Sequence, residues 1–281
     1  MPGPIALTCG EPSGIGPELA VSAWRSLKDR MAFFWIGDPS HLPDGAQIVE
    51  IEGPAEARDA MAQGLPVIRH GFDGALTRGH PNPDHAPAVI EVIARAVAWA
   101  KSGQASALCT SPIHKKALQD GAGFPYPGHT EYLAALAEVD DVVMMLASEQ
   151  LRVVPATIHI PLQEVPSALT PQTLETTIRI TQAALMRDFG LPSPRLAVAG
   201  LNPHAGEGGN MGTEEVSWIG PLLETLREQG FDVKGPMSAD TMFHAEAREG
   251  YDAAIAMYHD QALIPIKTLY FDRGVNLTLG L

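Results

Sequence analysis

The chain has 281 residues, of which 45% are hydrophobic and 19% charged, and its formal net charge is −14 at pH 7. This composition describes a globular chain that is long enough for one large or two ordinary domains. The acidic balance repels phosphate backbones and anionic membrane surfaces, so it argues against nucleic acid and membranes as partners.

Two cysteines, Cys9 and Cys109, lie inside apolar strand-like runs. This placement indicates small core residues in a reducing compartment, not a disulfide framework. The residues Met1 to Pro4 lack the basic flank and the long apolar core of a signal peptide, and no apolar run approaches the roughly 20 residues that a membrane helix needs. We therefore expect a cytoplasmic protein.

The first part of the chain alternates apolar runs with helical patterns. Pro4 to Cys9 predicts a buried strand, and the loop from Gly10 to Glu18 leads into a helix through about Leu27. The start of this helix is a potential anion site. A plain tight turn is the alternative, because the glycine spacing is not that of a dinucleotide fingerprint and Pro17 has no N–H to donate. Further strands are expected at Met31 to Ile36, Leu65 to Arg69 and Ala105 to Thr110, and a helix at Ala86 to Ala100.

Polar residues cluster around the expected domain boundary. A helical segment begins with His114, Lys115 and Lys116. Cations at a helix start interact unfavourably with the helix dipole, so an anionic ligand or a carboxylate neighbour there would relieve that cost. The alternative is a solvated pair of charges. A Gly/Pro-rich linker then separates a first domain, 1–122, from a second domain, 123–281. His129 and Thr130 open the next helix, where both can hydrogen-bond a substrate anion, although Thr130 can also act as the N-cap.

The second domain continues the alternation of strands and helices. Strands are expected at Val142 to Ala147, Leu151 to His159, Arg195 to Leu201 and Asp252 to Tyr258, and helices at Thr170 to Gly190 and Glu214 to Gln229, the latter with Val216, Ile219, Leu223 and Leu226 facing a sheet. This order predicts an α/β fold with mainly parallel sheets covered by helices. In such folds the loops at the carboxyl ends of the strands carry ligands.

A histidine follows each of three expected strands. His159 ends one strand, His259 follows another, and His204 lies in a glycine-rich loop, Leu201 to Glu215, after a third. Three imidazoles form a catalytic zinc or related divalent site with a position open to substrate; for each histidine alone, a structural role is the alternative. Asp260 would then orient His259, and the capping of a turn is the alternative role for Asp260.

Five motifs run along the chain: Gly10 to Pro17, Gly128 to Glu131, Gly200 to Glu207, Ala239 to Thr241 and Met257 to Gln261. Together they resemble the 4-hydroxythreonine-4-phosphate dehydrogenase family of vitamin B6 synthesis, and the resemblance extends from Thr8 to Leu281. It implies an isocitrate/isopropylmalate-dehydrogenase-like fold of two α/β/α domains and a homodimer with active sites at the subunit interface. It also implies NAD or NADP and one divalent metal per subunit, which is zinc, magnesium or cobalt.

The resemblance also assigns roles to individual residues. It places His159, His204 and His259 at the metal, His129, Thr130, Lys267 and Asn276 at the substrate, and Lys267 and Asp240 in catalysis. In the implied reaction a secondary hydroxyl loses hydride to the nicotinamide, and the resulting β-keto acid loses carbon dioxide. A metal held by three imidazoles would lower the pKa of that hydroxyl and stabilise the alkoxide. Cofactor-binding residues stay unassigned, because no ribose-binding acid follows a standard fingerprint.

Other functions stay open at this point. A paralogous dehydrogenase would act on a four-carbon sugar-acid phosphate or an aromatic cis-dihydrodiol acid, a metal-dependent hydrolase would use the same histidines, and an inactive binding protein is a further alternative. The family pattern continues past Gly274 to Leu281 into a segment that carries a substrate-binding arginine. Because the apolar end of this chain is strand-like, we expect that tail to be missing here.

Overall fold

The computed structural model describes residues 3–281, so Met1 and Pro2, which were part of the signal-peptide expectation, lie outside the described residues. The chain divides into two compact units, Met1–Glu138 and Val139–Leu281, which we call the first and the second unit. Residues 123–138 belong to the first unit, where α5 (His129–Ala137) contacts α3 (Ala86–Lys101).

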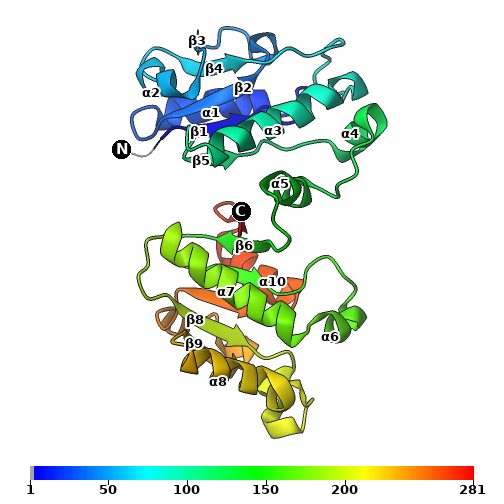
Figure 1. The fold of residues 1–281 in the computed structure, drawn as a ribbon, viewed down its shortest axis with the longest axis vertical. Helices are drawn as coiled ribbons and strands as arrows, with labels where there is room; N and C mark the ends of the chain where they lie inside the picture. Colours follow the sequence, from blue (N-terminus) through cyan, green and yellow to red (C-terminus); the bar gives the residue numbers. More distant parts are fainter. Residues whose placement is uncertain (1–2) are drawn as a thin grey trace. The chain divides into compact units, whose positions relative to one another are not determined.

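The first unit is built on a five-stranded sheet with the order β3-β4-β2-β1-β5, in which every neighbouring pair is parallel (Figure 1). Its strands are β1 (Ile5–Thr8), β2 (Phe33–Gly37), β3 (Ile48–Glu50), β4 (Leu65–Arg69) and β5 (Ala107–Cys109). Its other helices are α1 (Gly16–Leu27), α2 (Ala57–Ala60) and α4 (Lys115–Ala122). The predicted strands and helices are confirmed, whereas β3 was not predicted because its three residues lie in a Pro- and Gly-rich stretch.

The core of the first unit explains why its strands are continuous apolar runs. Phe34, Trp35 and Ile36 of β2 are fully buried, as expected for a central parallel strand that is covered on both faces. Cys9 is buried as predicted, but Cys109 is exposed. The core role expected for Cys109 was therefore wrong, because β5 is an edge strand of the sheet.

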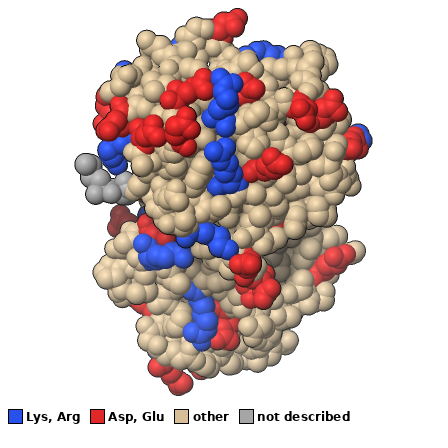
Figure 2. Space-filling view, turned by 45° about the horizontal axis from the view of Figure 1, so that its top comes forward, with Lys and Arg blue, Asp and Glu red and all other residues tan. Residues whose placement is uncertain are grey.

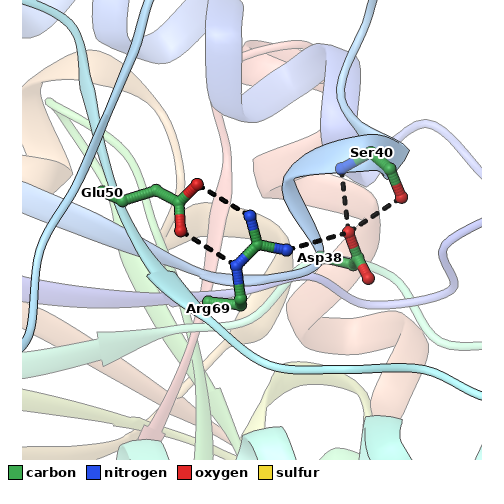
Figure 3. A network of polar contacts seen from close by, with 4 residues as sticks. All are labelled: Asp38, Ser40, Glu50 and Arg69. Carbon is green, nitrogen blue, oxygen red and sulfur yellow. Dashed lines mark hydrogen bonds and ion pairs between the residues drawn. The ribbon is translucent and has the colours of Figure 1, made fainter.

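Arg69 joins the ends of three neighbouring strands (Figure 3). Its Nε and Nη2 atoms donate to the carboxylate of Glu50 at 2.9 and 2.7 Å, and its Nη1 lies 3.8 Å from Oδ1 of Asp38. Asp38 also accepts from the backbone N–H and the hydroxyl of Ser40. Since Arg69 and Glu50 are exposed, water and salt screen their attraction, and the pair contributes little to stability.

The second unit contains a six-stranded sheet with the order β11-β6-β7-β10-β8-β9. Its strands are β6 (Val143–Ala147), β7 (Arg152–Pro155), β8 (Arg195–Ala199), β9 (Asp232–Met237), β10 (Ala253–Ala256) and β11 (Val275–Leu279). Its helices are α6 (Val165–Ala168), α7 (Pro171–Arg187), α8 (Gly220–Glu228), α9 (Ala245–Arg248) and α10 (His259–Tyr270). The neighbouring strands β7, β10, β8 and β9 are parallel to one another, whereas β6 is antiparallel to both β7 and β11.

Helices cover both faces of this second sheet (Figure 1). Ile255 of β10 packs in a cluster with residues of α7 and α8, whereas the adjacent Ala254 packs with residues of α10. This alternation is the period of two that a strand imposes on its side chains. The second unit is therefore an α/β/α sandwich, as the family resemblance implied.

One predicted helix face differs from the structure. Ile219, Leu223 and Leu226 are buried, but Val216 is 58% exposed. The helix begins with a π-helical segment, Glu215–Ile219, whose wider turn moves Val216 off the apolar stripe. The prediction for Val216 was therefore wrong.

The surface carries charges of both signs. Figure 2 shows basic side chains interspersed with acidic ones on the face drawn. Within residues 3–281, no helix combines the length and the apolar character that crossing a membrane requires.

Candidate active site

The three predicted metal-binding histidines follow neighbouring parallel strands of the second unit. β7, β10 and β8 are adjacent in the sheet, so their carboxyl ends lie along one edge. His159 follows β7, His259 is the first residue of α10 directly after β10, and His204 follows β8. The sheet thus brings three residues that are far apart in the sequence to one edge, where α/β folds bind ligands.

Two polar side chains connect the segments from which these histidines extend. Gln261 donates from Nε2 to the carbonyl oxygen of Gly200 at 2.8 Å, and its Oε1 accepts from the backbone N–H of Met257 at 2.7 Å. The hydroxyl of Thr157 donates to the carbonyl oxygen of Met257 at 2.7 Å. Because these bonds join the ends of β7, β8 and β10, the starting points of all three histidine segments are fixed relative to one another.

His159 and His259 face the same hollow. Their ring centroids lie 5.6 Å apart, and both rings line a pocket with Thr157 and Tyr258. Nδ1 of His259 lies 2.7 Å from Oδ1 of Asp260. With Nδ1 engaged, Nε2 of His259 is the ring nitrogen left to bind a ligand, which is the usual arrangement of a metal-binding histidine beside a carboxylate.

His204 lines an adjacent hollow with Asp240, Tyr258 and Gln261. Tyr258 lines both hollows, so the two are neighbours. The hydroxyl of Ser238 donates to Asp240 and holds the pKa of that carboxyl below its ordinary value, and the nearby His204 lowers this pKa further. Asp240 is therefore a carboxylate at neutral pH.

The donors at this edge suit a transition-metal ion. Among residues 3–281, no three His, Cys, Asp or Glu side chains are already close enough to hold a metal ion as they stand. His159 and His259 supply two imidazoles in one hollow, and His204 supplies a third from the next. Imidazole ligands favour zinc or cobalt over magnesium, which prefers oxygen ligands.

The backbone of two of the histidines is in an unusual conformation. His159 has φ of 55° and His204 has φ of 52°. A residue with a side chain is disfavoured in this left-handed region, and such residues concentrate at functional sites. Glu138, Ala205 and Glu207 share this conformation, so it agrees with a functional role for His159 and His204 but is not specific to them.

Lys267 and Asn276 occupy different surroundings. Lys267 lies in the last turn of α10 and lines a hollow with His259 and Asp260. Asn276 lies exposed in the edge strand β11, opposite Leu146 of β6. Lys267 therefore shares a hollow with His259, whereas Asn276 is not among the residues that line the hollows described above.

His129 and Thr130 lie in the first unit, at the start of α5. The N-cap of α5 is Gly128, so Thr130 is the second helical residue and not the cap. Burial lowers the pKa of His129, and the charge of Lys115 lowers it further. Nε2 of His129 is buried without a hydrogen-bond partner among the described residues. A neutral imidazole and an uncapped helix start are both compatible with a polar ligand.

The loop from Gly10 to Glu18 is arranged as a tight turn. The buried carboxylate of Glu11 accepts from the backbone N–H of Ser13 at 3.1 Å, and the N–H of Glu11 donates to the carbonyl oxygen of Pro112 at 2.8 Å. These amides are therefore engaged within the protein, which favours the turn over an anion site.

The segment in which we expected cations at a helix start is His114 to Lys116. There His114 caps α4 by accepting from the N–H of Ala117, and Lys116 pairs with Asp120.

Thr157, Glu215 and Tyr258 were not predicted as site residues. Thr157 and Tyr258 line the hollows, and the carboxylate of Glu215 contacts the loop that carries His204. For Thr157 and Glu215 the signal in the sequence was their position, after an apolar strand and in the first turn of a helix, whereas Tyr258 also lies in the motif Met257 to Gln261. Gln261 was recognised only as part of a motif.

Comparisons with known proteins agree with this geometry. A family profile described as pyridoxal phosphate biosynthetic protein PdxA matches residues 29–281. A curated relative from Roseobacter denitrificans, named 4-hydroxythreonine-4-phosphate dehydrogenase, is 60% identical over 279 residues, which is 99% of this chain and 86% of the relative.

Solved structures share the fold. A crystal structure of a 4-hydroxythreonine-4-phosphate dehydrogenase from Burkholderia phymatum has a TM-score of 0.89 and 38% identity, covering 100% of this chain and 88% of that one. A terephthalate 1,2-cis-dihydrodiol dehydrogenase from Burkholderia xenovorans has a TM-score of 0.72 and 27% identity, covering 100% and 87%. The chain therefore belongs to the enzyme family described as pyridoxal phosphate biosynthetic protein PdxA.

Proposed function

We propose that the chain catalyses the oxidation of 4-phosphohydroxy-L-threonine by NAD or NADP with a divalent metal, followed by decarboxylation to 3-amino-2-oxopropyl phosphate. The observation that carries this proposal is the placement of His159, His204 and His259 after three adjacent parallel strands, in a chain whose relatives are named for this substrate. In the first step hydride passes to the nicotinamide carbon and the hydroxyl proton is released. In the second step the carboxylate of the resulting β-keto acid leaves as carbon dioxide, and the carbon that carried it takes up a proton.

His159, His204 and His259 would hold one metal ion per subunit. When bound, this ion supplies stabilisation of negative charge on the substrate oxygen. Asp260 fixes the ring of His259 so that Nε2 is the ligand atom. Gln261 and Thr157 hold the three strand ends at fixed distances, which limits the loss of orientation that slows transfer reactions.

Two further side chains supply charge beside the histidines. The carboxylate of Asp240 faces the hollow of His204 and can accept the proton that the hydroxyl releases. Lys267 lines a hollow with His259, where its ammonium group can bind the substrate phosphate or donate a proton to the product of decarboxylation. We assign both residues to catalysis.

We propose that His129, Thr130 and Asn276, like Lys267, bind the substrate. The neutral imidazole of His129 can donate a hydrogen bond to a phosphate oxygen, and Thr130 can donate its hydroxyl from the first turn of the same helix. As the family resemblance implies, we also propose a homodimer with active sites at the subunit interface.

A second candidate substrate is an aromatic cis-dihydrodiol acid. The similarity to the terephthalate dihydrodiol dehydrogenase at 27% identity supports it. The higher identity of 60% to a relative named for the phosphorylated substrate favours the first candidate.

The test follows nicotinamide reduction by absorbance with each substrate, with NAD and with NADP. We expect turnover with 4-phosphohydroxy-L-threonine and release of one carbon dioxide per nicotinamide reduced. Faster turnover of the dihydrodiol acid would support the second candidate. Absence of reduction with both substrates, in the presence of added Zn²⁺ or Co²⁺, would contradict the proposed function.

A further inference from the structure

The segment that carries His204 is held in a left-handed turn. Residues 204–208 all have positive φ, between 43° at Glu207 and 76° at Gly206. Three of these five residues, His204, Ala205 and Glu207, have side chains, and such residues rarely adopt this conformation. A run of this kind persists only where the surrounding contacts hold it in place.

Those contacts come from Asn202 and the start of the following helix. The backbone N–H of Asn202 donates to Oε1 of Glu215 at 2.7 Å. Its side-chain Nδ2 donates to Oε2 of Glu215 at 3.0 Å and to Oε2 of Glu214 at 2.8 Å. The carboxylate of Glu215 is thus held by two bonds from Asn202, and Glu215 is only 3% exposed.

Three glycines leave the space that these side chains fill. A Cβ atom at Gly206 would lie 2.6 Å from Oε2 of Glu215, and one at Gly212 would lie 2.3 Å from Nδ2 of Asn202. A Cβ atom at Gly200 would lie 3.0 Å from Oε1 of Glu215. These three glycines therefore surround Glu215 and Asn202.

We propose that Glu215, acting through Asn202, is a positioning residue that sets the place of His204 at the candidate metal site. Asn202 and His204 are separated only by Pro203, whose fixed φ transmits the position of Asn202 to the histidine. A movement of the Glu215 carboxylate therefore moves the imidazole relative to His159 and His259. This inference rests on the proposed function, because it depends on His204 being a metal ligand.

The experiment measures the affinity of the metal-free full chain for Co²⁺ alone by calorimetry. Glu215→Gln places an N–H₂ donor opposite the donors of Asn202, and Asn202→Ala removes both side-chain bonds while the backbone bond to Glu215 stays. We expect both substitutions to raise the Kd for Co²⁺ about tenfold or more, as is typical when a residue that orients a metal ligand is lost. Glu224→Gln, which makes the same change of charge on the exposed face of α8, is the matched control and should bind Co²⁺ like the wild type.

The thermal midpoint of the metal-free chain is the second readout. A weaker affinity with a midpoint close to that of Glu224→Gln supports positioning. If Glu215→Gln does not fold, the Kd of Asn202→Ala for Co²⁺ tests the inference instead, because Asn202 is only partly buried. Gly206→Ala is a further test variant, because its added Cβ atom would displace the carboxylate of an intact Glu215.

Two results would overturn the inference, and they can be told apart. If the wild type binds Co²⁺, His204→Ala does not, and Glu215→Gln and Asn202→Ala bind it with wild-type affinity, the positioning role is wrong while the proposed function stands. If the wild type binds no Co²⁺, or His204→Ala binds it normally, the metal site of the proposed function fails and the inference fails with it.

Discussion

Gln261 donates to the carbonyl oxygen of Gly200 at 2.8 Å, and through its other amide atom it accepts from Met257. One side chain thereby joins the end of β8, which precedes His204, to the end of β10, which precedes His259. Neither strand end can shift without the loss of a hydrogen bond inside the protein. The spacing of the two histidines is therefore set by the sheet as well as by their loops.

Replacement of Gln261 by alanine should destabilise the second unit. The change removes both bonds and leaves the N–H of Met257 without its partner, which costs about 1–3 kcal/mol for a buried group. Urea unfolding followed by the fluorescence of Trp218, which packs against the core of this unit, measures the effect. The control is Gln172→Ala at an exposed position of α7, which should change stability by less than about 0.5 kcal/mol. Equal stability of the two variants would show that the bonds of Gln261 are unimportant.

Replacement of Asp260 by asparagine should weaken metal binding without abolishing it. The amide of the new side chain would no longer offer a charged acceptor to Nδ1 of His259, so the ring would lose its fixed orientation. We expect the Kd for Co²⁺ to rise about 10- to 100-fold with the stoichiometry unchanged. Asp272→Asn, at an exposed position just beyond α10, is the control. An unchanged Kd in Asp260→Asn would rule out the orienting role.

The first unit should lose stability at acid pH because of a buried histidine. Burial lowers the pKa of His41 below its ordinary value of 6.5, and the charges of His85 and Arg78 lower it further, whereas Asp38 opposes them. The unfolded chain therefore binds a proton below pH 6.5 before the folded chain does, so stability is fully present above this pH and falls as the pH drops toward the folded pKa.

Urea unfolding between about pH 5 and 8, followed by the fluorescence of the tryptophans in the first unit, measures this dependence. His41→Phe keeps an aromatic ring against Phe72 and should make the profile less steep, while His70 and His129, whose pKa values burial also lowers, keep part of the dependence. A profile as steep as that of the wild type would assign the pH dependence to other groups.

Gly10→Ala should destabilise the first unit. Gly10 has φ of +67°, and an added Cβ atom would lie 2.4 Å from the carbonyl oxygen of Pro112. Both the backbone conformation and this backbone contact oppose alanine, so we expect a loss of more than about 1 kcal/mol. Gly45→Ala is the control for conformation alone, because Gly45 has φ of +74° and open space around it. Thermal unfolding should show a larger loss for Gly10→Ala, and an equal loss would mean that the contact with Pro112 is not limiting.

The sequence pattern predicted those features that depend on local periodicity. Buried parallel strands such as β2 and β10 are short apolar runs, and the histidines after β7, β8 and β10 were recognised because their positions follow from the strands. β9 was missed since it contains Gly235 and Pro236, residues that usually interrupt strands. α10 was missed since Pro265 lies within it.

Contacts between distant residues could not be predicted in the same way. Glu215 looked like an ordinary first-turn acid, and only the folded loop shows its bonds to Asn202. Likewise, nothing in the pattern around Gln261 indicated that its amide would reach Gly200. Such contacts depend on how the strands are ordered in the sheet, and local periodicity does not contain that order.

In the function that we propose, a metal held by His159, His204 and His259 is required for oxidation of the phosphorylated substrate. The most direct measurement is nicotinamide reduction with 4-phosphohydroxy-L-threonine by the chelator-treated chain, titrated with Zn²⁺ or Co²⁺ while bound metal is quantified in the same samples. We predict that activity is absent without metal and rises in proportion to occupancy up to one ion per chain, and that His204→Ala neither binds the ion nor regains activity. Full activity in the metal-free chain, or one bound ion per chain in His204→Ala, would contradict the claim.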